Sequence, residues 1–449
     1  MAGRTSQFGA WYSSGPPGRE IDFGRQPRIP PSLCSGSIRG YFRFFPPGRG
    51  LVRFRKIAGA CRKDGGLDWG CMRTTRREHL VALATAALTS GLPCWADELG
   101  LSGAAQPTLR EAAAAAGLVF GSCSDEQFGK QPQAYQALFM SQCALYAGIL
   151  SWQGLAPDSS HEDDRRDPNV AVALDAGLKL TGAHLLWYEH TPAWLETLPR
   201  AQAQQAAAAH IQRVAGFYRG KCFSWNVVNE AINPRENGAD GLRLNNPLLR
   251  ALGPDYFEAA FREARAADPG ALLLYNEYDL ELDAPDQQAR RTALFHLLDR
   301  LQKAQVPIDG VGLQSHLKLA RMAEFHEKPY RAFLHDLKQR GLRIVITELD
   351  VDDRGAPASA EERDRAVADV YARFLAVALD EPAVMALVTW GLVDPYSWLN
   401  HTKYFPQFVR ADGLPQRPLL FDAEFRPKLA FDAVLHALQQ APRRENLPA

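Results

Sequence analysis

The sequence predicts an α/β protein built as a single (β/α)8 TIM barrel, and three observations favour this fold class. From residue 105 onward, short apolar runs alternate with longer segments of helical period. There are eight such runs, and near-continuous apolar strands that alternate with helices are typical of a parallel sheet covered on both faces. No GxGxxG motif follows any run, which argues against an open dinucleotide-binding sheet.

The predicted strands follow one another along the chain, each with a polar or Gly-containing turn after it. They are "GLVFGS" (117–122), "CALYAGI" (143–149), "KLTGAHLLW" (179–187), "FSWNVVNE" (223–230), "LLLYNEY" (272–278), "GVGLQS" (310–315), "IVITELD" (344–350) and "LVTWGLV" (387–393). Segments rich in Ala, Leu and Arg lie between them, for example residues 201–220 and 363–379, and predict the covering helices. This number of strand–helix units predicts a barrel that closes on itself.

The beginning of the chain is predicted to lie outside the barrel domain. Residues 1–71 are rich in Gly, Pro and Arg and show no helical or strand period. Residues 72–96 combine the pair Arg76 and Arg77 with an apolar stretch and a small-residue ending, and they resemble a twin-arginine export signal. The native chain would then start at Met72, with residues 1–71 a disordered, non-native upstream extension. The barrel domain would comprise residues 97–449 and be exported to the periplasm or the medium. The competing interpretation of residues 72–96 is an ordinary amphipathic helix. The competing interpretation of residues 1–71 is a basic tail that binds a partner.

The composition argues against several classes of partner. The chain carries 51 basic and 51 acidic residues, so its charge gives no reason to expect nucleic acid or an anionic membrane as a partner. No apolar stretch reaches the length of about 18 residues that a membrane-spanning helix needs. The seven cysteines form no CxxC pair and have no metal-ligand spacing, so we expect no metal and no cofactor.

Polar and aromatic residues stand at the ends of the predicted strands. In a barrel of this kind the chemistry takes place at the C-terminal ends of the strands. Indole faces stack on the C–H groups of a sugar, amides bind its hydroxyls, and two carboxyl groups can cleave a glycosidic bond. Any one of these residues could equally be a strand cap or a core aromatic, but five strand ends agree on a sugar site. The residues are Asn229, Glu230, Asn276 to Tyr278, Gln314, His316, Glu348, Asp350 and Trp390.

Four motifs occur in a fixed order on the predicted barrel. They are "SWNVVNEA" (224–231), "GVGLQSHL" (310–317), "IVITELDV" (344–351) and "VTWGLVDPYSWL" (388–399). Together they resemble the strands and the last loop of glycoside hydrolase family 10, the retaining endo-β-1,4-xylanases, with Asn226 where Asp is usual. The resemblance extends from about Leu109 to residue 434.

The resemblance implies a double-displacement mechanism on a β-linked polysaccharide, with Glu348 as the nucleophile and Glu230 as the acid/base. It implies that His316 holds Glu348 ionised and that Asn229 hydrogen-bonds the 2-hydroxyl of the substrate. The other implied substrate-binding residues line the cleavage site or form its aromatic walls: Tyr278, Gln314, Trp187, Trp390 and Trp398.

The resemblance fails on the side of the site that holds the non-reducing sugar. The second strand has Ala147, Gly148 and Ser151 where the family has Glu, Asn and Lys. The third strand keeps Trp187 but has Ala183, Tyr188 and His190 where His, His and Gln are usual. His184, one place along, is expected to point to the opposite face of its strand and not to replace the missing His.

Three functions are compatible with this sequence. The first is an endo-β-1,4-xylanase-like glycosidase, and the second is a β-glycosidase for an exopolysaccharide or a decorated glycan. The third is a non-catalytic barrel that binds carbohydrate. The two carboxyl groups and their Asn and His neighbours favour an enzyme.

Overall fold

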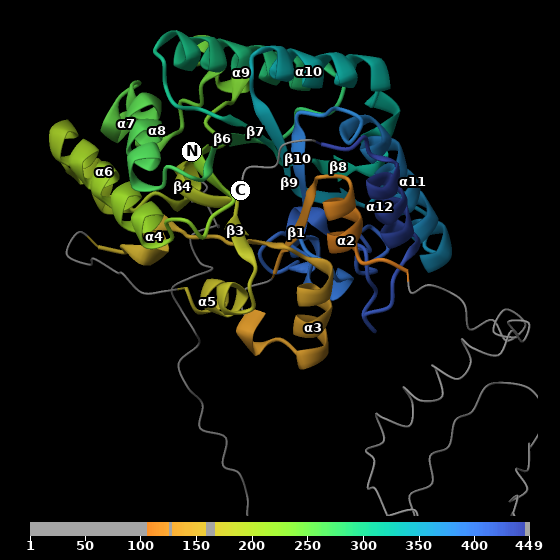
Figure 1. The fold of residues 1–449 in the computed structure, drawn as a ribbon. Coiled ribbons are helices and arrows are strands. Elements are labelled where there is room, and N and C mark those ends of the chain that lie inside the picture. The colour runs from red at the N-terminus through yellow and green to blue at the C-terminus, as the bar shows by residue number, and fades with distance from the viewer. Residues whose placement is uncertain (1–105, 125–127, 159–166, 445–449) are drawn as a thin grey trace, which may run out of the picture. The chain divides into compact units, whose positions relative to one another are not determined.

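The computed structural model describes residues 106–124, 128–158 and 167–444 (Figure 1). The predicted export signal and the upstream extension lie outside the described residues and stay predictions. The described residues form the predicted α/β barrel, with the helices around the outside of the strands (Figure 1).

Every predicted apolar run contains a strand, and the sheet is parallel throughout. Its order is β3-β2-β1-β10-β9-β7-β6-β5-β4, and β8 pairs with β9 off this path. The strands are β1 Val119–Cys123, β2 Leu145–Ala147, β3 Lys179–Thr181, β4 Ala183–Trp187, β5 Ser224–Asn229, β6 Leu272–Glu277, β7 Gly310–Leu313, β8 His316–Lys318, β9 Arg343–Asp352 and β10 Val384–Thr389.

The barrel closes because β3 and β4, at the two ends of this order, are halves of one predicted strand. Gly182 separates them and has a φ of +66°, a left-handed conformation that favours glycine. A parallel bridge from Leu180 to Cys222 joins β3 to the residues before β5, and β4 pairs directly with β5. The sequence prediction of a closed (β/α)8 barrel is confirmed, and the break at Gly182 is the one departure in the third strand.

The helices that cover the strands begin at recognisable caps. Thr108 and Glu111 form a capping box at α2, Asp167 caps α5 before Pro168, and Ser359 caps α11. Within the described ranges, no helix is both long and apolar enough to cross a membrane. The α-helices are α2 Leu109–Ala115, α3 Gln133–Gln142, α4 Trp152–Leu155, α5 Pro168–Asp175, α6 Arg200–Phe217, α7 Pro247–Leu252, α8 Tyr256–Ala267, α9 Pro285–Lys303, α10 Glu327–Gln339, α11 Ala360–Ala378 and α12 Leu429–Gln440.

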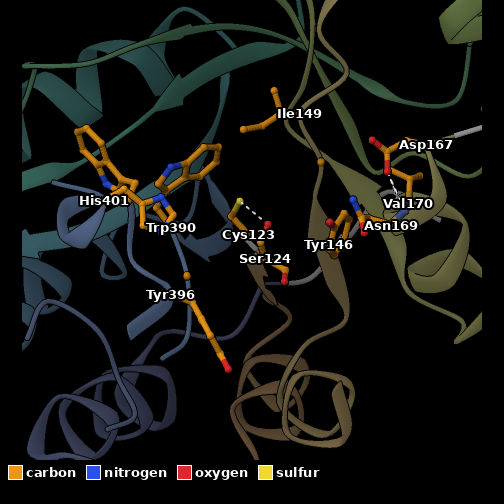
Figure 2. A pocket seen from close by; sticks show the side chains of 13 residues that line it. Cys123, Ser124, Tyr146, Ile149, Asp167, Asn169, Val170, Trp390, Tyr396 and His401 are labelled. Carbon is orange, nitrogen blue, oxygen red and sulfur yellow. Dashed lines mark hydrogen bonds between the residues drawn. The ribbon is translucent and has the colours of Figure 1, made fainter. Parts of the chain in front are cut away.

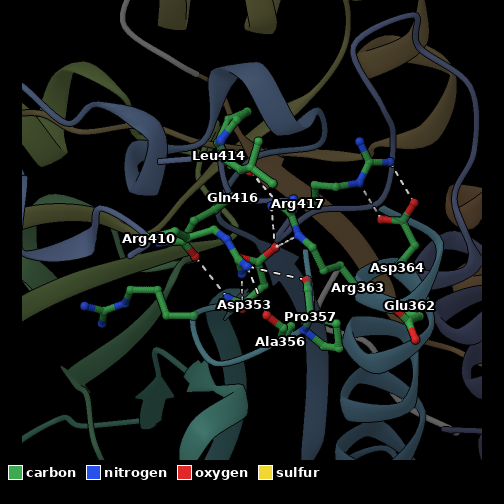
Figure 3. A network of polar contacts seen from close by, with 12 residues as sticks. Asp353, Ala356, Pro357, Glu362, Arg363, Asp364, Arg410, Leu414, Gln416 and Arg417 are labelled. Carbon is green, nitrogen blue, oxygen red and sulfur yellow. Dashed lines mark hydrogen bonds and ion pairs between the residues drawn. The ribbon is translucent and has the colours of Figure 1, made fainter. Parts of the chain in front are cut away.

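The long loop between β10 and α12 is bound to the end of β9 by a buried polar network around Asp353 (Figure 3). Asp353 Oδ2 accepts hydrogen bonds from Arg363 Nε at 2.9 Å and from the backbone N–H of Arg417 at 3.0 Å. Asp353 Oδ1 accepts from Arg410 Nη1 at 3.1 Å, and Gln416 Oε1 accepts from the Asp353 N–H at 3.0 Å. Because a buried carboxylate left without its partners is costly, these bonds fix the loop against the strand.

Candidate active site

A cleft of about 380 Å³ opens where the strands β4 to β10 end, and the predicted site residues meet there. Eight of the predicted residues line it: Glu230, Glu348, Tyr278, Gln314, His316, Trp187, Trp390 and Trp398. The ninth, Asn229, lies beneath the cleft and is 1% exposed. Its Nδ2 donates to Glu230 Oε1 at 3.1 Å, and its Oδ1 accepts from Asn276 Nδ2 at 2.8 Å.

Glu348 lies on β9 and is buried among hydrogen-bond donors. Its Oε1 accepts from Asn276 Nδ2 at 2.8 Å, and its Oε2 lies 3.2 Å from His316 Nε2. Burial alone would raise the pKa of Glu348, but the neighbouring imidazoles of His184 and His316 outweigh it and lower the pKa to about 2. The Glu348 carboxylate is therefore ionised at any pH at which the protein would work.

His316 is the cation beside Glu348. Its Nδ1 lies 2.9 Å from Asp350 Oδ1, so the imidazole is held between two carboxylates. Burial tends to lower the pKa of His316, but the charges of Asp350 and Glu348 and their hydrogen bonds raise it to about 10. The protonated ring donates from both nitrogens and thereby fixes the orientation of Glu348.

Glu230 directly follows β5 and has a φ of 56°, which is unusual for a residue with a side chain. Its Oε1 accepts from Gln314 Nε2 at 2.8 Å, and its Oε2 accepts from Trp187 Nε1 at 3.1 Å. Burial raises the pKa of Glu230, and the nearby charge of Glu348 adds to the rise against the opposing hydrogen bond from Gln314. Backbone strain of this kind is found where a side chain must be aimed at one place. Glu230 is thus favoured in its acid form beside an ionised Glu348.

Asn276, at the end of β6, is a site residue whose role the sequence analysis missed. Its Nδ2 donates both to Asn229 and to Glu348, and its Oδ1 accepts from Thr347 Oγ1 at 2.8 Å. A Cβ at Gly312 would lie 2.2 Å from this Oδ1, so only glycine leaves room for the amide. Asn276 therefore links Asn229, the neighbour of the expected acid Glu230, to the expected nucleophile Glu348 through hydrogen bonds. Its place at a strand end was the signal available in the sequence.

Arg243 is a second residue that sequence reasoning missed. Its Nε donates to the backbone carbonyl of Glu230 at 3.0 Å, and its Nη2 donates to the hydroxyl of Tyr278 at 2.9 Å. Its guanidinium also lies 4.0 Å from the centre of the Tyr188 ring. These contacts support the strained turn at Glu230. Arg243 stands in a loop and belongs to no motif, so no sequence pattern indicates its role.

One wall of the cleft is aromatic. Trp398 Nε1 donates to Asp350 Oδ2 at 2.6 Å, and its ring lies 5.2 Å from that of His316. Phe405 and Phe408 pack against Trp398 at centroid distances of 5.1 and 4.7 Å. The Asp353 network holds the loop that carries these rings, so the wall is fixed before any substrate binds.

The positions where the family has polar residues on β2 serve other purposes here. Ser151 Oγ accepts from Gly154 N at 3.2 Å and so caps the short helix α4. A Cβ at Gly148 would lie 2.8 Å from Leu180 Cδ1 and 3.1 Å from Val170 Cγ2, so a larger residue there would have to displace both. Ala147 is buried at the end of β2. These three residues offer no side chain that could replace the missing Glu, Asn and Lys.

A side pocket of about 90 Å³ adjoins the cleft next to these positions (Figure 2). It shares Ile149, Trp390 and Trp398 with the cleft. Figure 2 shows Asp167 and Asn169 on one side of the pocket and Trp390 on the other. Ser124, Tyr146 and His401 also line it. The side pocket is therefore a polar and aromatic extension of the cleft on the altered side of the site.

The expectation for His184 is wrong. The imidazole is 5% exposed and points toward the site, with Nε2 3.9 Å from Glu348 Oε1. The expectation took position 183 as the position that faces the site, as in the family, and therefore placed the neighbouring residue 184 on the opposite face. In this chain β4 begins at Ala183, directly after the left-handed Gly182, and its residue 184 is the one directed at Glu348.

The fold and the site together define a class of protein. The mouth of the barrel holds one ionised carboxyl group and one that favours the protonated form, surrounded by indoles and amides. This arrangement is that of a glycoside hydrolase. The chain belongs to glycosyl hydrolase family 10, whose sequence profile matches residues 108–437.

Named relatives and solved structures agree with this family. The chain is 29% identical to endo-1,4-beta-xylanase B of Thermotoga neapolitana over 299 residues, which cover 65% of this chain and 79% of that protein. It is 30% identical to endo-1,4-beta-xylanase 5 of Pyricularia oryzae over 344 residues, 74% of this chain and 79% of that protein. The crystal structure of native xylanase 10B from Thermotoga maritima matches with a TM-score of 0.63 at 27% identity, covering 74% of this chain and 98% of that chain.

Proposed function

We propose that the protein is a retaining glycoside hydrolase of the endo-β-1,4-xylanase type, with Glu348 as the nucleophile and Glu230 as the acid/base. The observation that carries the proposal is that the two carboxyl groups of one cleft favour opposite protonation states. The pKa of Glu348 is lowered to about 2, and that of Glu230 is raised. Carboxyl groups whose pKa values are pushed apart are suited to separate roles. The two relatives named above are endo-1,4-xylanases, which supports a xylan-type substrate.

The proposed reaction has two steps. In the first, Glu348 attacks the anomeric carbon, the glycosidic C–O bond breaks, and Glu230 gives its proton to the leaving oxygen. In the second, ionised Glu230 takes a proton from water while that water attacks the anomeric carbon and releases Glu348. Esterification removes the negative charge of Glu348, which lowers the pKa of Glu230 and prepares it to act as a base. No cofactor is needed.

Retention of configuration is the first expected result. With xylohexaose as substrate, the hydrolysis product that forms first should carry the β-anomer, because two displacements at the same carbon restore its configuration. Proton NMR of the anomeric signals during the first minutes distinguishes this product from the α-anomer that appears later by mutarotation. An α-anomer as the first product would contradict the assignment of Glu348 as a covalent nucleophile.

The side pocket favours a second candidate, a β-glycan whose glycone carries a small substituent. Its volume of about 90 Å³ is smaller than the cavity of about 150 Å³ that holds a benzene molecule. A hydroxymethyl or acetyl group fits such a space, whereas a whole branching sugar does not. Asp167 and Asn169 supply polar groups at its edge. Xylanase-type chemistry would then act on a substituted chain.

The lost glycone contacts should make unsubstituted xylohexaose a poor substrate. A hydrogen bond to a neutral partner contributes about 0.5–1.5 kcal/mol and one to a charged group about 1.5–3 kcal/mol. The missing Glu, Asn, Lys and His therefore remove on the order of 4–8 kcal/mol, of which Tyr188, Glu189 and His190 at the cleft can restore a part. We expect kcat/KM for xylohexaose about a thousandfold below that of a family member with the full set of contacts.

A comparison of oligosaccharides tests the side pocket directly. An acetylated xylo-oligosaccharide or a glucose-containing β-glycan of equal length should recover much of the loss. Asn169→Phe should narrow the side pocket and abolish this preference, whereas Asn169→Ala removes the same amide without filling the space and should keep it. If xylohexaose is cleaved at ordinary xylanase rates and is preferred over every substituted substrate, the side pocket has no part in specificity.

A further inference from the structure

His184 is a buried polar residue that the proposed mechanism has not used. It lies on β4, is 5% exposed, and neither ring nitrogen has a hydrogen-bond partner among the described residues. Its Nε2 lies 3.9 Å from Glu348 Oε1, and its ring centre lies 5.1 Å from that of Trp187. Buried polar groups in native proteins are nearly always hydrogen-bonded. An imidazole kept in this state next to a carboxylate therefore calls for a functional reason.

The position of His184 relative to the cleft limits what it can do. Trp187, three residues further along β4, lines the cleft, but His184 is not among the lining residues. It sits beneath the cleft, on the far side of Glu348 from His316. His316 contacts Oε2 of Glu348, and His184 faces Oε1. Any effect of His184 on a sugar must then pass through Glu348.

We propose that His184 is a positioning residue for the nucleophile, which becomes a hydrogen-bond donor to Glu348 Oε1 when substrate occupies the cleft. Hydrogen bonds at active sites are often long before substrate binds and shorten in the reacting complex. With an imidazole at each oxygen, the Glu348 carboxylate cannot rotate without losing one of these contacts. It is thereby held with one oxygen directed at the anomeric carbon. This inference rests on the proposed function.

The charged and titratable groups around this pair are few. Glu348 faces His316 from β8, with Asp350 behind that ring, and Glu230 from the end of β5. His184 faces Glu348, Glu230 and His190. Burial, with a contribution from His184, lowers the pKa of His190 to about 3, so His190 is neutral and does not compete as a cation. Two polar neighbours are uncharged: Asn276, which donates to Glu348 Oε1, and Asn226, which stands opposite His184 in the pairing of β4 with β5.

His184 stands next to the position where the family has its usual histidine. The family's usual histidine is absent at position 183, where this chain has alanine. The left-handed backbone of Gly182 starts β4 afresh, and His184 stands opposite Asn226 of β5 in the pairing. An imidazole thus reaches the nucleophile from the next position along the strand.

Two substitutions and a matched control test this role. His184→Phe keeps a ring of similar size without its N–H groups, and His184→Gln restores a donor. His210→Phe is the control, because His210 is also a buried imidazole but bonds to the carbonyl of Leu185 at 3.0 Å and stacks on Trp152, away from the cleft. Kinetics are measured with xylohexaose and an aryl β-xyloside from pH 2 to 9, and circular dichroism confirms that each variant is folded at each pH.

We expect His184→Phe to lower kcat by about tenfold or more with little change in KM, because only the transition state uses the fully oriented nucleophile. The imidazole of His184 already lowers the pKa of Glu348 in the free protein, so without it this pKa should rise and the acidic limb of the kcat/KM profile should move to higher pH. His184→Gln should recover part of kcat and move the limb back. His210→Phe should lower thermal stability without moving the limb. A folded His184→Phe or His184→Gln protein with the wild-type kcat and acidic limb would overturn the proposal.

A titration separates this proposal from the proposed function. Carbon-13 NMR of glutamate side-chain carboxyls, with the Glu348 signal assigned by its loss in Glu348→Gln, reports the pKa of Glu348 whether or not the protein hydrolyses xylan. A higher pKa in His184→Phe than in the wild type supports the positioning role even if xylohexaose proves not to be a substrate. An unchanged pKa overturns it even if the wild type is an active xylanase.

Discussion

Glu348→Gln should remove hydrolysis of every glycoside, with kcat lowered by about 10⁵-fold or more. The amide keeps the size of the side chain and can still contact Asn276 or His316, but it cannot form the glycosyl ester. The neighbouring carboxylate cannot take over, since Asp350 is held by both His316 and Trp398. Turnover of aryl β-xylosides gives the most sensitive measurement, because their leaving groups make the first step easy.

A matched control separates loss of the nucleophile from loss of charge. Glu361→Gln makes the same chemical change on the exposed face of α11, where Glu361 pairs only with Arg365, and should leave turnover unchanged. Substantial aryl-glycosidase activity in Glu348→Gln, with retained configuration, would show that another group forms the intermediate.

Glu230→Ala should produce a loss that depends on the leaving group. General acid catalysis contributes up to about 10⁴-fold, and only a poor leaving group needs the proton. Xylohexaose should therefore lose most of its kcat/KM, while a dinitrophenyl xyloside should form its glycosyl ester at nearly the wild-type rate. Azide, a small anion that needs no general base, should enter the vacated space and restore turnover of the aryl substrate as β-xylosyl azide.

The pH dependence gives the same prediction a second measurement. Burial above all, with the charge of Glu348, raises the pKa of Glu230, so the acid form survives to a higher pH than for an ordinary carboxyl group. Activity on xylohexaose is present below this raised pKa and is lost as the pH increases through it. This basic limb should disappear in Glu230→Ala. Equal losses on good and poor leaving groups, with no effect of azide, would mean that Glu230 is not the acid/base.

The fold was predictable because its signal is repeated many times along the chain. Apolar runs such as residues 272–275 have no polar interruption, and residues 363–379 have helical period, so each strand–helix unit supports the others. The division of the third strand was not predictable in this way. A glycine inside an apolar run is compatible with a regular strand, and only the three-dimensional structure shows that Gly182 has a φ of +66° and divides the strand.

The site was predictable as far as it depends on strand ends. Glu230, Gln314 and Glu348 stand at the ends of separate strands, and the barrel brings such ends together whatever the intervening sequence. His184 was assigned to the wrong face because the side of residue 183 was taken from the family, and a change of one position moves a side chain to the other face. Arg243 reaches the site from a loop, where the sequence has no periodic signal. The side pocket arises from packing between segments distant in sequence, which no local pattern describes.

Asp353 attaches the loop between β10 and α12 to the end of β9, so the aromatic wall carried by this loop is positioned by β9. Glu348, the Asp350 carboxylate that holds Trp398, and Asp353 all belong to one short stretch of backbone. The spacing between the nucleophile and the wall is therefore set by these few extended residues and not by the length of the loop. Residues 411–414 are exposed between Arg410 and Gln416, which both contact Asp353, and added loop length costs little conformational entropy. A segment inserted there would leave the distance between Trp398 and Glu348 unchanged.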